Sequence, residues 1–356
     1  MTIVSKTHQF VVGVDTHARN HVYAIIDATT GEHINTRGFP TTIAGIKRAL
    51  NWAGKRTRGD ADVLWVIEGS ASYGAILAGT VSSAGYPVAE APRMSSKTRY
   101  GVGKSDSLDA RRIAAAVLPL QIDQLRTPRL NDGVRAALHV LLAARESMTT
   151  ERTSAVNALT ALLRTQELGM DARKALTAAK ITEVSKWRER NEKLALAIAR
   201  TEAIRLAQRI VDLDQQLRAN MLRLTELVTV SEAAPLLDMT GCGPVTAAVA
   251  LTTWSHRNRV RSEAAFASLA GVNPIPASSG NTVRHRLNRG GDRRLNKALH
   301  MVAVTRMVHD EETRIYAQKR KAEGKTVKEI RRCIKRYLAR KIYRILNASV
   351  PTPTVT

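Results

Sequence analysis

The N-terminal third of the chain alternates short apolar runs with amphipathic segments, a pattern typical of an α/β fold. The predicted strands span residues 9–15, 21–27, 33–39, 62–68 and 86–89, and the predicted helices span 42–53 and 73–84. Short turns join the first three strands into an antiparallel meander, whereas strands and helices alternate after it. This order predicts a mixed sheet with helices on both faces.

Two of the predicted strands end in a carboxylate. Asp15 closes the first apolar run, and Glu68 closes the strongly apolar run of residues 62–68. In open α/β sheets, ligands bind beyond the carboxyl ends of the strands. Taken singly, each acid could equally be a strand-end residue that faces solvent, so the pair gains meaning only from further acids nearby.

Two more carboxylates stand where a later helix should begin. Ser105 is a good helix cap, and Asp106 and Asp109, three residues apart, share one face of the helix that follows. They could simply complement the helix dipole. If they lean over the edge that holds the two strand-end acids, however, four carboxylates repel one another unless cations bind. Such a set typically holds two Mg²⁺ ions about 4 Å apart that clamp a phosphodiester.

The context of these acids resembles a known family. The segments 14–16 (Val-Asp-Thr), 66–70 (Val-Ile-Glu-Gly-Ser) and 104–111 (Lys-Ser-Asp-Ser-Leu-Asp-Ala-Arg) are similar to the RuvC-like domain of the DEDD-type insertion-sequence transposases, which are recombinases guided by a bridge RNA. The resemblance covers about the first 120 residues. It implies an RNase H/RuvC-like fold and a metal-binding, catalytic role for four acids. These are Asp15, Glu68, Asp106 and Asp109.

The middle of the chain has little Gly or Pro and follows a helical period. Its apolar seam consists of Leu206, Ile210, Leu213, Leu217, Leu224 and Leu227. The polar Asn220 occupies one inward position of this seam, as in helices whose register is fixed by a buried Asn. The pattern fits an antiparallel hairpin within one chain as well as a coil between chains. The resemblance implies a coiled-coil arm that helps to assemble a homodimer or homotetramer.

After this arm, two glycines bracket Cys242 between apolar segments. Gly241 and Gly243 fit the hairpin of a helix-hairpin-helix, in which backbone amides approach a phosphate. A tight turn between packed helices is the alternative for this motif alone. Cys242 has no cysteine partner nearby for a metal, so we expect it to be a small spacer.

A proline-bounded loop then presents Ser278, Ser279 and Gly280. Ser-Gly in a loop is usually only a turn. The segment nevertheless looks like the family's serine-bearing block, in which a serine before glycine attacks DNA, and this places the nucleophile at Ser279 with Ser278 as the alternative. Basic residues on the far side of the loop and in the last helix are the expected nucleic-acid contacts. They are Arg284, Arg286, Arg289, Arg293, Arg294, Lys335 and Arg336.

The strongly positive net charge favours nucleic acid as the partner of this chain. At +24, with a pI near 10.7, the chain is suited to a phosphate backbone. A membrane surface is the alternative, but no apolar run approaches the roughly 20 residues of a transmembrane helix, and no signal peptide is visible. With two distant cysteines, a disulfide scaffold is excluded and a cytoplasmic location is expected. Aromatic residues make up only 4% of the chain, so base stacking is not the expected mode of recognition.

Together these features predict a chain of four parts. They are a RuvC-like catalytic domain (1–132), a helical coiled-coil arm (133–232), a mainly helical transposase domain (233–350) and a disordered tail (351–356). The resemblance implies an RNA-guided recombinase that acts on donor and target DNA through Mg²⁺ and a phosphoserine link. The alternative is a structure-specific nuclease or junction-binding protein that forms no covalent intermediate.

Overall fold

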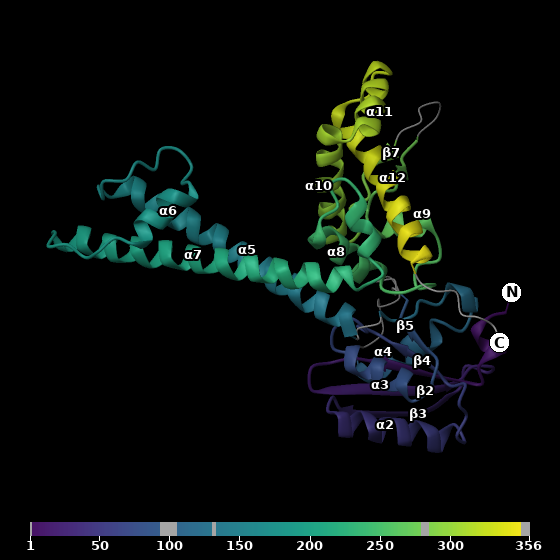
Figure 1. The fold of residues 1–356 in the computed structure, drawn as a ribbon. Coiled ribbons are helices and arrows are strands. Elements are labelled where there is room, and N and C mark those ends of the chain that lie inside the picture. The colour runs from purple at the N-terminus through teal and green to yellow at the C-terminus, as the bar shows by residue number, and fades with distance from the viewer. Residues whose placement is uncertain (1, 93–104, 130–132, 279–284, 350–356) are drawn as a thin grey trace. The chain divides into compact units, whose positions relative to one another are not determined.

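The computed structural model describes residues 2–92, 105–129, 133–278 and 285–349 (Figure 1). The chain forms two compact units, Met1–Asn131 and Asp132–Thr356. Each unit has its own hydrophobic core.

The N-terminal unit is built on a five-stranded mixed sheet in the order β3-β2-β1-β4-β5. Its strands are β1 (Phe10–Asp15), β2 (Asn20–Asp27), β3 (His33–Pro40), β4 (Leu64–Ile67) and β5 (Val88–Glu90). Strands β1, β2 and β3 pair antiparallel, whereas β4 and β5 run parallel to β1. The predicted mixed sheet with an antiparallel start is therefore confirmed.

Helices cover both faces of this sheet, as predicted. Strand β1 alternates, so Val12 and Val14 face one core while Val11 faces the other. The first face carries α2 (Ile43–Arg56) and α3 (Ala75–Ser83), and the second carries α4 (Asp106–Ala115). The short helices α1 (Val4–Thr7) and η2 (Ile122–Gln124) complete the unit.

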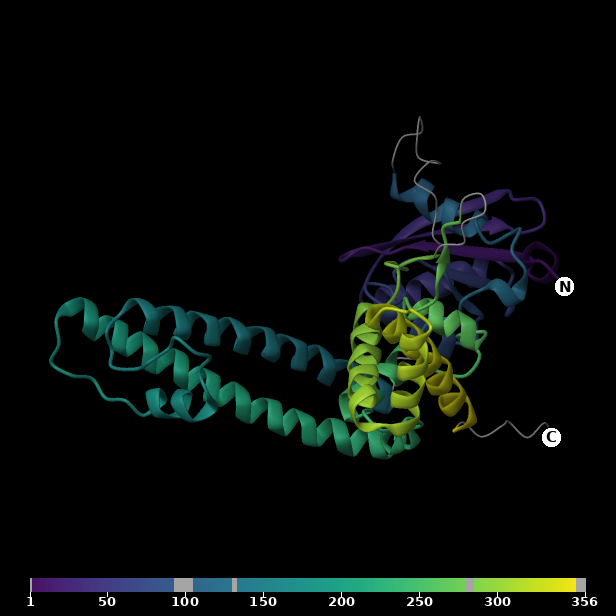
Figure 2. The ribbon, with the colours of Figure 1, turned by 90° about the horizontal axis from the view of Figure 1, so that it is seen from above.

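The C-terminal unit begins with a long helical hairpin. Helix α5 (Gly133–Thr165) and helix α7 (Leu194–Thr229) run side by side, and α6 (Ala178–Ser185) packs on α7 (Figure 2). Asn220 points inward as predicted, is 7% exposed, and donates from Nδ2 to the Leu141 carbonyl of α5 at 3.1 Å. The apolar seam of α7 thus packs against α5 of the same chain. Of the two arrangements that the sequence pattern allowed, this is the antiparallel hairpin within one chain.

The remaining elements form a helical cluster around Trp254 and Phe266. They are η3 (Ala234–Asp238), α8 (Pro244–Trp254), α9 (Glu263–Leu269), β6 (Ile275–Pro276), β7 (His285–Arg286), α10 (Arg293–His309), α11 (Glu311–Ala322) and α12 (Val327–Ala348). The apolar stripe of α12 is buried at Ile330, Ile334 and Leu338. A short 3₁₀ helix, η3, precedes the paired glycines, so a helix-hairpin-helix stays a prediction.

Within the described ranges, no helix combines the length and the apolar character that a membrane crossing requires.

Candidate active site

Asp15 is fixed at the end of a fully buried strand of the N-terminal unit. All six residues of β1 are buried, and Asp15 itself is 8% exposed. It pairs with Val22 of β2, and the alternation of β1 turns Asp15 toward the face that carries α4. The carboxylate therefore has a rigid backbone and little solvent.

Gly13 lets α4 approach that strand unusually closely. A Cβ atom at Gly13 would lie 2.2 Å from the Ala110 carbonyl oxygen and 2.5 Å from the Ala114 nitrogen, both backbone atoms of α4. Only glycine leaves room for this contact. The close approach brings the first turn of α4 to the end of β1, two residues beyond Gly13.

The first turn of α4 carries the two helical acids. The Ser105 hydroxyl accepts from the Leu108 amide at 3.4 Å, which confirms the predicted cap. Asp106 is exposed, whereas Asp109 is 8% exposed and accepts from Arg112 Nη1 at 3.3 Å. The two acids thus differ in environment, since Asp109 is buried and Asp106 is exposed.

A histidine that the sequence analysis did not single out joins the acids. His17 Nε2 lies 3.2 Å from Asp15 Oδ2 and 3.6 Å from Asp106 Oδ2. Ligand atoms of these three residues all lie within 4.8 Å of one another. The His17 amide donates to Nδ1 of the buried His21 at 3.3 Å, so the turn that carries His17 is held against β2.

The electrostatics of the cluster favour a bound cation. Burial raises the pKa of Asp15, and the carboxylates of Asp109 and Asp106 raise it further, although His17 opposes them. A divalent ion would neutralise this repulsion. The donor set of two carboxylates and one imidazole suits such an ion. The residues present therefore fit a metal centre.

Glu68 is adjacent to Asp15 through its backbone. Its amide donates to the Val14 carbonyl at 3.0 Å, and its carbonyl accepts from the Thr16 hydroxyl at 2.9 Å. The alternation of β4, in which Leu64 and Val66 face the α4 core, directs residue 68 to the same face. The Glu68 side chain is exposed and is not part of the compact group formed by Asp15, His17 and Asp106.

In the C-terminal unit, the paired glycines have different roles. Gly241 has a φ of +82°, and a Cβ there would lie 3.1 Å from Thr305 Cβ of α10, so it allows both a turn and close packing. Gly243 is exposed and caps α8. Between them, Cys242 is 3% exposed and its burial raises the thiol pKa to about 12, in keeping with a small spacer.

The serine block is framed by a two-stranded hairpin. Strands β6 and β7 pair antiparallel, with Pro276 opposite His285 and Ile275 opposite Arg286. Ser278 is exposed just after β6. Ser279 and Arg284 lie outside the described residues, in the segment that connects the two strands.

A basic groove lies at the foot of this hairpin. Its volume is about 830 Å³, and it is lined by β7, by the segment that follows it and by α12. Lys335 from α12 is 9% exposed and donates from Nζ to Asn296 Oδ1 at 2.6 Å. Asn296 Nδ2 in turn donates to the Ala270 carbonyl at 2.7 Å. Burial lowers the pKa of Lys335, because a buried ammonium group loses its hydration.

Most of the predicted basic contacts surround Lys335. Arg286 and Arg336 line this groove, Arg293 lines an adjoining hollow of about 500 Å³, and Arg289 lines both. Arg294 instead forms an ion pair with Glu146 of α5, so its charge is already matched. The structure thus gathers four of the predicted arginines with Lys335 and separates one.

Two features of the site escaped sequence reasoning, and each had a weak signal. His17 follows the strand-end Asp15 by two residues, which places it in the same turn. Asn296 lies one turn into α10, after Asp292, which caps that helix through the Leu295 amide. Neither residue belongs to an apolar period, so the hydrophobic pattern did not single it out.

Comparison with known proteins gives two family matches and one curated relative. A family model described as "Transposase IS116/IS110/IS902 family" matches residues 233–318, and a model for the DEDD type, described as "Transposase", matches residues 12–166. The chain is also 27% identical, over 313 residues, to the insertion element IS110 uncharacterized 43.6 kDa protein of Streptomyces coelicolor. That alignment covers 74% of this chain and 76% of the relative.

Both family models describe transposases, which are enzymes that cut and join DNA strands. The chain belongs to the DEDD-type insertion-sequence transposases. The first matched segment contains Asp15 and the acids of α4 and continues through α5 of the C-terminal unit, and the second contains the serine block.

Proposed function

We propose that this transposase is an RNA-guided recombinase that combines a Mg²⁺ site with a serine nucleophile. The acids Asp15, Glu68, Asp106 and Asp109 would hold two metal ions, and Ser279 attacks the DNA. The observation that carries the proposal is the packing of α4 on Gly13, which brings Asp106 and Asp109 to Asp15.

In the metal half of the site, bound Mg²⁺ would neutralise charge on the phosphodiester oxygens. Asp15 supplies a carboxylate on a rigid strand, and Asp106 supplies one from the helix. His17 lies between these two and holds the exposed Asp106 side chain near the strand. A rotation of the exposed Glu68 side chain would add the fourth acid, because its backbone is hydrogen-bonded beside Asp15.

In the serine half, the Ser279 hydroxyl oxygen attacks the scissile phosphorus. The phosphorus–oxygen bond to the neighbouring nucleotide breaks, and the chain keeps one DNA end as a phosphoserine ester while the other end leaves as a hydroxyl. The groove cations Arg286, Arg289 and Lys335 are suited to hold the flanking phosphates. The serine proton would pass to one of the carboxylates of the acid cluster.

A covalent intermediate is the decisive test of this chemistry. Wild-type protein incubated with labelled DNA and Mg²⁺, then denatured, should retain the label on the protein. Ser279→Ala should lose it, and the neighbouring Ser278→Ala should keep it. If the wild-type protein releases only free DNA ends, the protein is a hydrolytic nuclease. If only Ser278→Ala loses the label, the nucleophile is one residue earlier.

The specificity of the reaction is proposed to come from a structured guide RNA. Few aromatic residues are available to read bases, and the basic groove offers cations for phosphates. Protein purified free of RNA should therefore not recombine its sites. Full specificity without RNA would refute this part of the proposal and leave the serine chemistry untouched.

We further propose that the active sites are composite, with the four acids from one subunit and Ser279 from another, in a dimer or tetramer. Such sharing withholds cleavage until the assembly is complete. Mixing Asp109→Asn protein with Ser279→Ala protein should restore part of the activity, because some sites then receive two intact halves. Mixtures without activity at any ratio would show that each subunit builds its own site.

A further inference from the structure

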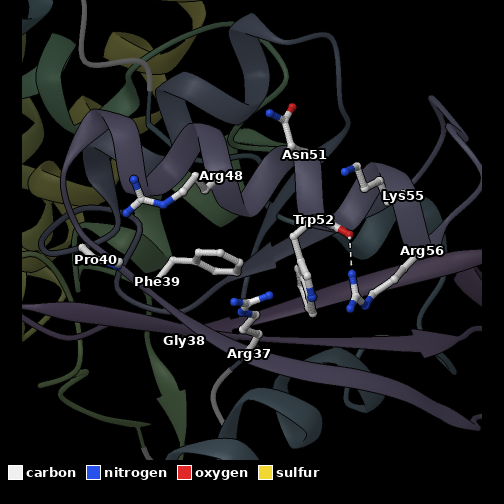
Figure 3. Close-up of a pocket in the computed structure, with 9 residues that line it drawn as sticks. All are labelled: Arg37, Gly38, Phe39, Pro40, Arg48, Asn51, Trp52, Lys55 and Arg56. Carbon is white, nitrogen blue, oxygen red and sulfur yellow. Dashed lines mark hydrogen bonds between the residues drawn. The ribbon is translucent and has the colours of Figure 1, made fainter.

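The N-terminal unit also has a basic hollow, and it lies on the opposite face of the sheet from the acid cluster. Its volume is about 530 Å³, and it lies between the edge strand β3 and helix α2 (Figure 3). Four cations line it, and no acidic residue does. They are Arg37 from β3 and Arg48, Lys55 and Arg56 from α2.

The periodicity of α2 builds this surface. Arg48 and Lys55 are seven residues apart, or two turns, so both project from one side of the helix about 10 Å apart. The helix contains no Asp or Glu that could neutralise them. Arg37, Arg48 and Lys55 are exposed, and none has an ion-pair partner among the described residues.

Two buried aromatic rings form the floor of the hollow. Phe39 and Trp52 lie side by side with ring centroids 5.7 Å apart, and they are 6% and 4% exposed. Arg37 lies over Phe39 at 5.4 Å and Arg56 over Trp52 at 5.1 Å, while Arg56 Nη1 also donates to the Trp52 carbonyl at 3.4 Å. Figure 3 shows these two arginines flanking the Trp52 ring. The rings cannot stack on bases, but they hold the two guanidinium groups in place.

This hollow cannot serve the scissile phosphate. It lies on the α2 face of the sheet, where Phe39, Ile46 and Trp52 form the core. Asp15 faces the opposite side, where Gly13 contacts α4. The thickness of the sheet and its packed side chains separates the two surfaces.

We propose that the hollow between β3 and α2 binds the phosphate backbone of a nucleic-acid segment away from the cleavage point. Its unpaired cations match a run of phosphates, which in duplex DNA follow one another by about 3.4 Å per strand along the axis. Its closed floor leaves the bases unread, so the contact is independent of sequence. The inference needs only that the enzyme handles nucleic acid and does not depend on the serine or on RNA guidance.

The salt dependence of binding tests this assignment. Full-length Arg48→Gln/Lys55→Gln protein should bind a short duplex more weakly, and the slope of log affinity against log salt should become shallower by about two. Both side chains are exposed, so thermal unfolding should not change. For each single variant, the slope should become shallower by about one. The matched control is Lys6→Gln/Lys47→Gln, which removes two exposed charges from the same unit without touching the hollow.

Parallel titrations with duplex DNA and with an RNA hairpin identify the source of the phosphate. A slope change with only one of them assigns the hollow to that nucleic acid, and a change with both assigns a general backbone contact. Equal slopes for the variant and the control, with both probes, would overturn the proposal. None of these outcomes depends on cleavage, so a failure here is distinct from a failure of the proposed serine chemistry.

Discussion

Replacing Gly13 with alanine tests whether the candidate active site depends on the packing of α4 against β1. The added Cβ would lie 2.2 Å from the Ala110 carbonyl oxygen, 2.5 Å from the Ala114 nitrogen and 2.8 Å from Ala114 Cβ. Two of these three are backbone atoms, so no side-chain rotation relieves the contact. Helix α4 must retreat by roughly 1 Å to restore ordinary van der Waals distances.

The expected cost has two components. Overpacking of this kind lowers the free energy of unfolding by about 1–3 kcal/mol, so the protein should remain folded at moderate temperature. A shift of about 1 Å in groups that position a reaction can lower the rate by about 100-fold. Because Asp106 and Asp109 move with α4 while Asp15 stays on β1, DNA cleavage should fall by that order.

The assay compares cleavage of a labelled DNA substrate with unfolding by denaturant. Gly79→Ala is the matched control, because Gly79 lies inside α3 of the same unit and a Cβ there meets no atom within 4 Å. That variant should keep full cleavage and gain about 0.5–1 kcal/mol of stability, as alanine does in a helix interior. Wild-type cleavage and stability in Gly13→Ala would refute the idea that this contact positions the acids.

Two further predictions follow from the buried ionisable groups. Burial raises the pKa of Asp15 from its usual 3.8, with Asp109 and Asp106 adding to the effect, so the folded state binds more protons than the unfolded one near that pH. Metal-free protein should therefore lose stability as pH rises through this window, and Asp15→Asn should unfold at a higher temperature at pH 7. Added Mg²⁺ should stabilise the wild type but not this variant, and equal stabilisation of both would argue against a metal at Asp15. Cys242, with a thiol pKa of about 12, should resist alkylation in native protein at mildly alkaline pH while the partly exposed Cys333 reacts, so mass spectrometry should find one modified thiol before denaturation and two after it.

Much of the N-terminal unit could be predicted because β1 and β4 are buried on both faces. Continuous apolar runs ending in Asp15 and Glu68 located β1 and β4, and the predicted cap at Ser105 located α4. The contact between Gly13 of β1 and helix α4 could not be predicted from hydrophobic periodicity. Gly13 interrupts an apolar strand, which indicates a close approach of some backbone, but the sequence does not say which one.

Pairing between distant side chains was beyond the reach of the sequence. Arg294 was expected to contact nucleic acid with its neighbours, yet it is paired with Glu146, a residue more than one hundred positions earlier. Asn220 was expected to face a helix, and its partner Leu141 became known only from the fold. Local patterns determine which face a residue occupies, whereas a partner depends on how separate segments pack.

The acid cluster and the serine block are built on separate cores. The acids rest on the sheet of the N-terminal unit, whose cores contain Val12 and Val11, and the serine block rests on a helical cluster around Trp254. A substitution that disables one half should leave the other half folded, because no core residue is shared between the two clusters. Under the proposed serine chemistry, the acid cluster and Ser279 would act on the same DNA strand. That chemistry would add a step before cleavage, in which assembly on nucleic acid, rather than folding of the chain, decides whether a strand is cut.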